Sequence, residues 1–214
     1  MSSIATAGSS AIEIDPAAQA VLEFWFGDAL TLDWPSESRK DLWFGGGAEL
    51  DQRITQSFGH LVAAALAGNL SPWQEDPLQR LALVVLMDQF TRNVFRAQAQ
   101  AFSGDGVAQA LVTDAMAREW DTQLPLAGRV FLAMPWMHAE SLELQLRCVG
   151  YFSMLCAAAR PEHQAALRGH LEAAGEHREI VARFGRFPHR NKALGRASTP
   201  EEVSYLANGR NFGQ

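Results

Sequence analysis

The sequence has little of what marks secreted or membrane proteins. Its two cysteines, Cys148 and Cys156, are about 12 Å apart along a helix at about 1.5 Å per residue, which is beyond disulfide reach within one helix. We therefore expect free thiols in a cytoplasmic protein. Residues 1–14 contain no basic residue and no long apolar run, which predicts a disordered lead-in and not a signal peptide. No apolar run approaches the roughly 18 residues of a membrane span.

Motifs of several enzyme classes are also missing. The sequence has no glycine-rich phosphate loop, no Gly-x-Ser-x-Gly motif and no His-Glu-x-x-His motif. No pair has metal-ligand spacing among the candidate acids and histidines, which are Asp88, His138, Glu140, His177 and His189. We therefore expect no metal and no cofactor. The net charge of −6 argues against nucleic-acid binding, which favours a basic face.

The apolar residues recur with helical spacing along the chain, and strand-type alternation is nearly absent. The chain has 214 residues, 48% of them apolar, which is enough for a sizeable core. No linker interrupts the pattern, and no repeat of about 20–50 residues is visible. We predict an all-α protein of eight to ten helices, with residues 15–214 forming one domain.

Capping signals mark several helix starts. In Asp15-Pro16 and Asp76-Pro77, an acid that caps helices precedes a proline at the first helical position. Thr199–Glu202 has the residues of a capping box. The helix after Asp76-Pro77 is predicted to run to about Arg96. Its middle, residues 81–87, is apolar on every side, which is typical of a central helix.

Polar side chains interrupt the apolar helices in three clusters. In the first, Asp88 and Arg92 lie four residues apart, which places them on one helix face in the favourable acid-first order. Asn93 extends the same polar strip. Because these residues follow an apolar run, they are expected to be partly buried, and buried charges need partners. The cluster is either a structural ion-pair network or the wall of a site.

The second cluster surrounds Pro135, which is predicted to start a helix. His138 and Glu140 then lie near its first turn, where unpaired amides and the helix dipole favour an anion. Residues two apart do not share a helix face, so this pair is poorly suited to chelation. His138 is either a hydrogen-bonded structural residue or a general base.

The third cluster, residues 183–196, holds five formal positive charges, one histidine and no acid, although the whole chain is acidic. Gly185 suits a left-handed helix end and Pro188 stiffens the turn that follows. This leaves a constrained loop that carries four polar side chains, which are Arg186, His189, Arg190 and Asn191. Arginine binds carboxylate or phosphate through two parallel hydrogen bonds. The alternative is a solvated basic loop that caps the preceding helix.

At these residues the chain resembles a bacterial family known as domain of unknown function 924. The resemblance covers about residues 20–212 and rests on four motifs, which are Val21–Gly27, Asp88–Arg96, Met134–Glu140 and Gly185–Arg196. It implies a tetratricopeptide-like helical fold and no particular activity. One residue departs from the family pattern, since Thr91 stands where proline is expected. With threonine the helix is able to continue past this position.

The three clusters lead to two hypotheses about function. The first is a binding module that holds a small anionic molecule or an acidic peptide. The second is a small hydrolase or transferase for an anionic substrate, with His138 or His189 as the base and Asp88 or Glu140 orienting it. A purely structural network is the third alternative. The residues expected to bind the ligand are Asp88, Arg92, Asn93, His138, Glu140, Arg186, His189, Arg190 and Asn191.

Overall fold

The computed structural model describes residues 13–208, and these form an all-helical fold without strands. The ten α-helices of this part are α1 (Pro16–Phe26), α2 (Ala29–Leu32), α3 (Ala48–Leu66), α4 (Pro77–Val84), α5 (Thr91–Val94), α6 (Asp105–Ala117), α7 (Leu126–Met137), α8 (Leu142–Ala158), α9 (Pro161–Phe184) and α10 (Pro200–Asn208). The predicted all-α class is confirmed. The single-domain, tetratricopeptide-like arrangement stays a prediction. Residues 1–12 of the predicted lead-in lie outside the described residues.

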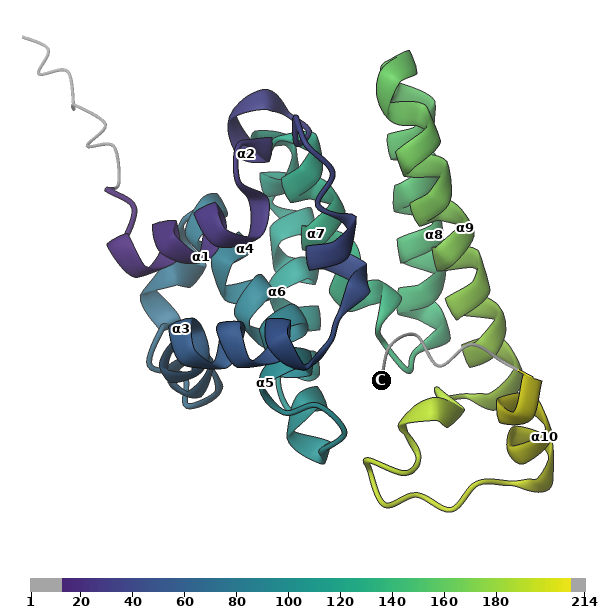
Figure 1. The fold of residues 1–214 in the computed structure, drawn as a ribbon. Helices are drawn as coiled ribbons and strands as arrows, with labels where there is room; N and C mark the ends of the chain where they lie inside the picture. Colours follow the sequence, from purple (N-terminus) through teal and green to yellow (C-terminus); the bar gives the residue numbers. More distant parts are fainter. Residues whose placement is uncertain (1–12, 209–214) are drawn as a thin grey trace, which may run out of the picture.

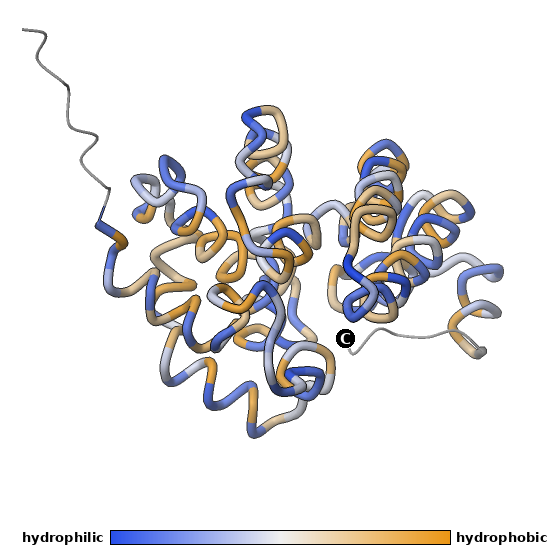
Figure 2. Tube along the Cα trace, turned by 90° about the horizontal axis from the view of Figure 1, so that it is seen from above, coloured by the Kyte–Doolittle hydropathy of each residue, from blue (hydrophilic) through white to orange (hydrophobic). Residues whose placement is uncertain are grey.

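Helices α1 to α7 gather into one group, and α8 and α9 stand beside it as a pair (Figure 1). The short connection between α8 and α9 makes them antiparallel neighbours. Polar and apolar residues interchange along the helices, so that most carry an apolar face (Figure 2). The main core contains the rings of Trp25, Phe90 and Phe131, which meet edge to face. Between residues 13 and 208 no helix has the length and apolarity needed to cross a bilayer.

The capping signals determine where the helices begin. Asp15 Oδ1 accepts a hydrogen bond from the Ala17 amide, and Asp76 Oδ1 accepts from two amides at the start of α4. In the capping box before α10, Glu202 accepts from the Thr199 amide at 2.7 Å, and the Glu202 amide donates to the Thr199 hydroxyl at 3.2 Å. These three predicted helix starts are confirmed.

The central helix runs from Pro77 to Val94 without a break, with a π-helical segment, Val85–Phe90, in the middle. The Thr91 amide donates to the Leu86 carbonyl, five residues earlier, and the Thr91 hydroxyl donates to the Met87 carbonyl at 2.8 Å. Proline has no amide hydrogen for this bond. The helix therefore continues past Thr91, and the wider turn shifts the side chains around Asp88 relative to a regular α-helix.

One local prediction is wrong. Pro135 lies inside α7 and starts no helix. The proline removes a single amide hydrogen bond, near the C-terminal end of that helix. Helix α9 continues through Gly175 to Phe184. At the start of α6, Gly104 occupies the cap position and Asp105 is the first helical residue.

Gly104 fills a place that no other residue fits. A Cβ atom there lies 2.5 Å from the Met87 carbonyl oxygen and 3.0 Å from the Met87 Cβ. The loop before α6 therefore packs directly against the π-helical segment of the central helix. This contact brings Asp105, the next residue, beside Asp88 and Arg92.

We expect Gly104→Ala to destabilise the protein by about 1–3 kcal/mol, because the added methyl group meets backbone and forces both segments apart. Each kcal/mol corresponds to a fall in melting temperature of about 2–4 °C for a chain of this size. Gly106→Ala is the matched control, since nothing lies within 4 Å of its Cβ position and alanine favours the helix. Equal melting temperatures for the two variants would contradict the packing argument.

Candidate functional site

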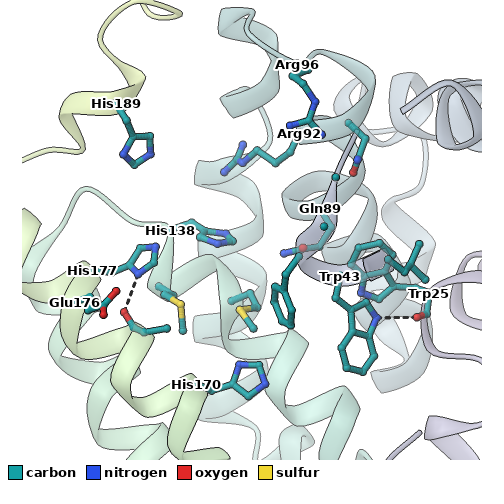
Figure 3. A pocket seen from close by; sticks show the side chains of 18 of the residues that line it. Trp25, Trp43, Gln89, Arg92, Arg96, His138, His170, Glu176, His177 and His189 are labelled. Carbon is teal, nitrogen blue, oxygen red and sulfur yellow. Dashed lines mark hydrogen bonds between the residues drawn. The ribbon is translucent and has the colours of Figure 1, made fainter. Parts of the chain in front are cut away.

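A cavity of about 420 Å³ lies between the α1–α7 group and the segment formed by α9 and the loop after it. Its polar lining consists of Gln89, Arg92, Asn93, Arg96, His138, Glu176, His177, His189 and Arg190. The other lining residues are one further histidine, His170, and nine apolar, aromatic or glycine residues, which are Trp25, Leu42, Trp43, Phe44, Gly45, Gly46, Met134, Met137 and Ala173. Figure 3 shows this cavity from close by.

The structure brings five of the nine predicted site residues to the cavity, and these come from three separate stretches of the chain: Arg92, Asn93, His138, His189 and Arg190. A sixth, Asp88, lies directly behind His138 and is fully buried. The clusters that the sequence shows as separate therefore meet in space, as charged groups beside apolar helices are expected to do.

His138 and Asp88 form a hydrogen-bonded pair. His138 Nδ1 lies 2.8 and 2.9 Å from the two carboxylate oxygens of Asp88. An ionised carboxylate only accepts, so Nδ1 carries the proton and the neutral ring keeps a lone pair on Nε2. Burial alone raises the pKa of Asp88, but His138, Arg92 and a hydrogen bond from Gln89 outweigh it and hold the pKa below its ordinary value.

His138 reaches this position from a helix end and not from a helix start. It is the C-cap of α7, and its amide donates to the Met134 carbonyl. Helix α8 begins only at Leu142, after the Ser141 cap. The predicted stabilisation of an anion by amides near His138 is therefore wrong, because the amides of this turn already serve α7.

Asp105 joins Arg92 to Arg190. Its Oδ1 accepts from Arg92 Nη2 at 2.6 Å, and its Oδ2 accepts from Arg190 Nη1 at 3.2 Å. Arg92 also lies 3.8 Å from Asp88 Oδ1. Burial raises the pKa of Asp105, and the two arginines only partly offset this. A continuous chain of polar contacts thus runs from His138 through Asp88, Arg92 and Asp105 to Arg190, and in it two carboxylates alternate with two arginines.

Arg190 is held more tightly than an arginine on a solvated loop. Its side chain is 7% exposed, and its guanidinium lies over the rings of Phe102 and Phe187 at 4.8 and 4.5 Å from their centroids. Burial and the nearby Arg92 lower its pKa to about 10. Its Nε is buried and has no acceptor within residues 13–208, as is also true of Trp25 Nε1.

Three other histidines line the cavity as neutral rings. Burial lowers the pKa of His170 and of His177 to about 4 and that of His189 to about 3, and nearby charge contributes for the last two. A carbonyl only accepts, so His177 Nδ1 donates to the Ala173 carbonyl at 2.8 Å and its Nε2 has no proton. The cavity therefore combines arginine cations with uncharged imidazoles.

Glu140, Arg186 and Asn191 do not line this cavity, and their role in ligand binding stays a prediction. Glu140 binds Arg196 through both of its oxygens, at 2.6 and 2.8 Å, and accepts from the Phe187 amide.

Arg186 and Asn191 both bind the buried carboxylate of Glu202. Together these contacts brace the loop from Gly185 to Thr199 and hold His189 and Arg190 in place.

The prediction of the site missed Arg96, His170, Glu176 and His177. The last three lie on α9 together with Ala173, at spacings of three, six and seven residues from His170, which is one face of a helix. From the sequence, that spacing could have indicated that these residues share one surface. Asp105 had no such signal, because an acid at a helix start is fully explained as a cap.

The described part of the chain is thus an all-helical protein with a polar cavity that is lined in part by arginines. The chain belongs to a family described as a bacterial protein of unknown function, DUF924, which matches residues 21–210. It is similar to the solved structure of ATU0120 from Agrobacterium tumefaciens, also a protein of unknown function. The two are 34% identical, with a TM-score of 0.73 over 90% of this chain and 97% of that one. No curated protein matches the chain significantly.

We expect the free energy of unfolding to decrease as the pH falls from about 6.5 toward 4. In this range His177 takes up a proton in the unfolded chain but stays neutral where it is buried in the folded protein. The contribution of His177 is fully present above its ordinary pKa of 6.5 and is lost toward its folded pKa of about 4. His177→Gln should reduce the slope of unfolding free energy against pH by up to one proton, about 1.4 kcal/mol per pH unit. Urea unfolding across this pH range measures the slope.

The control for this measurement is His60→Gln, because His60 is exposed on α3. That variant should keep the pH slope of the unmodified protein. A slope in His177→Gln equal to that of the unmodified protein would show that His177 takes up its proton equally well in the folded state.

Proposed function

We propose that the protein binds a small anionic molecule in this cavity. One observation carries the proposal. Besides one acid, Glu176, the lining holds three arginines, namely Arg92, Arg96 and Arg190, and each of them binds at least one aspartate outside the lining, Asp51, Asp88 or Asp105. The cations are thus held from behind by carboxylates outside the lining, which fixes their positions before a ligand arrives.

The unsatisfied donors support the same proposal. Arg190 Nε and Trp25 Nε1 belong to lining residues, are buried, and have no acceptor within residues 13–208. Buried polar groups are nearly always hydrogen-bonded. Both groups are donors, so the partner that satisfies them is rich in acceptors, as carboxylates and phosphates are.

The size of the cavity favours a small molecule over an acidic peptide. Its volume of about 420 Å³ falls in the range of roughly 300–1,000 Å³ that is typical of small-molecule sites. The three arginines are matched by three aspartates, so the region has no large excess of positive charge. Recognition then depends on directed hydrogen bonds more than on long-range attraction. A cytoplasmic location and a tetratricopeptide-like array belong to the same proposal.

The His138–Asp88 pair favours a second candidate, a hydrolase or transferase acting on the bound anion. A buried carboxylate that fixes the tautomer of a histidine leaves Nε2 able to accept a proton. His138 lines the cavity, and no described residue bonds to its Nε2. In this candidate function, Nε2 takes a proton from water or from a hydroxyl group of the substrate, and the arginines stabilise the negative charge that develops.

Arg96 gives the cleanest test of binding, because its side chain is 31% exposed, whereas loss of a buried charge partner such as Arg190 costs about 3–5 kcal/mol of stability. Arg96→Gln removes the charge and keeps an amide donor for Asp51. We expect calorimetry to show at least a tenfold loss of affinity for inorganic phosphate or acetate, since a charge-assisted hydrogen bond contributes about 1.5–3 kcal/mol.

Arg147→Gln is the matched control, because Arg147 lies on α8 outside the cavity and, within residues 13–208, forms an ion pair with Glu143 alone. Equal losses in the two variants would mean that overall charge explains binding. Failure of phosphate and acetate to bind the unmodified protein would count directly against the proposal.

The catalytic candidate is tested by His138→Gln with the anionic ester p-nitrophenyl phosphate as the probe. General-base catalysis contributes about 10²–10⁴ in rate, so turnover should fall by about that factor. Phosphate affinity should change little, because glutamine still donates to Asp88. Hydrolysis that survives in the variant, or that is absent in the unmodified protein, would reject His138 as the base.

A further inference from the structure

The cavity has two chemically different ends. Figure 3 shows Arg92, Arg96 and His189 on one side and His170 with Trp43 on the opposite side. His138 and Gln89 lie between them. A ligand that contacts both ends must itself combine a charged and an apolar part.

We infer that the ligand is a carboxylate or phosphate that carries an aromatic or other flat apolar group. This inference rests on the proposed binding of an anion and adds to it the chemistry of the rest of the molecule. The anionic group lies at the arginine end, and the flat group lies against the aromatic end.

Contacts among three rings define the aromatic end. Trp43 and Phe44 lie 6.2 Å apart between ring centroids, and Phe44 and His170 lie 5.9 Å apart. Met134 and Met137 add flexible apolar surface to the lining. Burial holds His170 neutral, with a pKa of about 4. No carboxylate or cation lies among these side chains, so this end is suited to an apolar group and not to a second charge.

Phe44 is the residue that marks this end as a binding surface. Its side chain lines the cavity although the residue is 59% exposed. Small-molecule sites are lined mainly by apolar and aromatic side chains, so a partly exposed ring in the lining is suited to contact a ligand. Gly46 and Gly47, with φ of 70° and 121°, form the turn that follows the helical segment Asp41–Gly45, which carries Phe44.

The position of His138 between the two ends adds a consequence for the second candidate function. A ligand that spans the cavity places the junction of its anionic and apolar parts beside His138. In a phosphate that carries an aromatic group, that junction is the phosphoester bond. The general base is therefore located beside the bond that a hydrolase has to break.

The inference is tested with matched pairs of probes, inorganic phosphate against phenyl phosphate and acetate against phenylacetate. Calorimetry should show that the phenyl group strengthens binding by at least about tenfold, because burial of an aromatic ring removes a large apolar area from water. Phe44→Ala should reduce that advantage, measured with the same pairs of probes on the variant, by about threefold or more. Leu146→Ala, at an equally exposed apolar residue on α8, should leave that advantage unchanged.

The outcomes separate this inference from the proposed function. Equal affinity for phosphate and phenyl phosphate would overturn the inference while anion binding stands. A phenyl advantage that survives intact in Phe44→Ala would also overturn it, since the ring would then lie elsewhere. Benzyl alcohol serves as the neutral probe. If it binds as tightly as phenyl phosphate, the arginines do not contribute, and both the proposed function and the inference fail.

Discussion

The arrangement of the site depends on one chain of polar contacts, from His138 through Asp88, Arg92 and Asp105 to Arg190, in which two carboxylates alternate with two arginines. Its members come from the end of α7, the central helix, the start of α6 and the loop after α9. Each carboxylate bridges two groups that are distant in sequence. The chain therefore ties the α1–α7 group to the C-terminal segment, and it does so at the wall of the cavity.

Stability alone does not explain why these charges are buried. Moving an ion out of water costs several kcal/mol, and apolar replacements of buried ion pairs are often neutral or stabilising by about 1–4 kcal/mol. The surrounding core, with fully buried rings such as Phe90 and Phe131, already supplies apolar contacts that hold the helices together. The buried charges instead fix the positions of the polar groups. The guanidinium of Arg190 binds Asp105 and lies over two phenylalanine rings, so its position is fixed, as a binding site requires.

The sequence predicted the fold well and the site in part, for physical reasons. Helix starts are local, so Asp76-Pro77 and Thr199–Glu202 were sufficient to locate them. Ion pairs, by contrast, often join residues that are far apart in the sequence. The spacing of Asp88 and Arg92 predicted correctly that they share a helix face, and they lie 3.8 Å apart, but each also binds a closer partner from another segment, which the spacing did not indicate. Similarly, no pattern around Glu140 indicates that Arg196, 56 residues later, neutralises it.

The same logic explains which predicted residues reach the cavity and which do not. In the basic segment after α9, Arg186 and Arg196 meet Glu202 and Glu140 outside the cavity, and these pairs shape the loop. Arg190 points instead toward Asp105, and His189 lines the cavity beside it. Within this one basic segment, some residues thus stabilise the loop and others line the cavity, depending on where their acidic partners lie. The acids belong to other segments of the chain, so the division becomes visible only when the chain is folded.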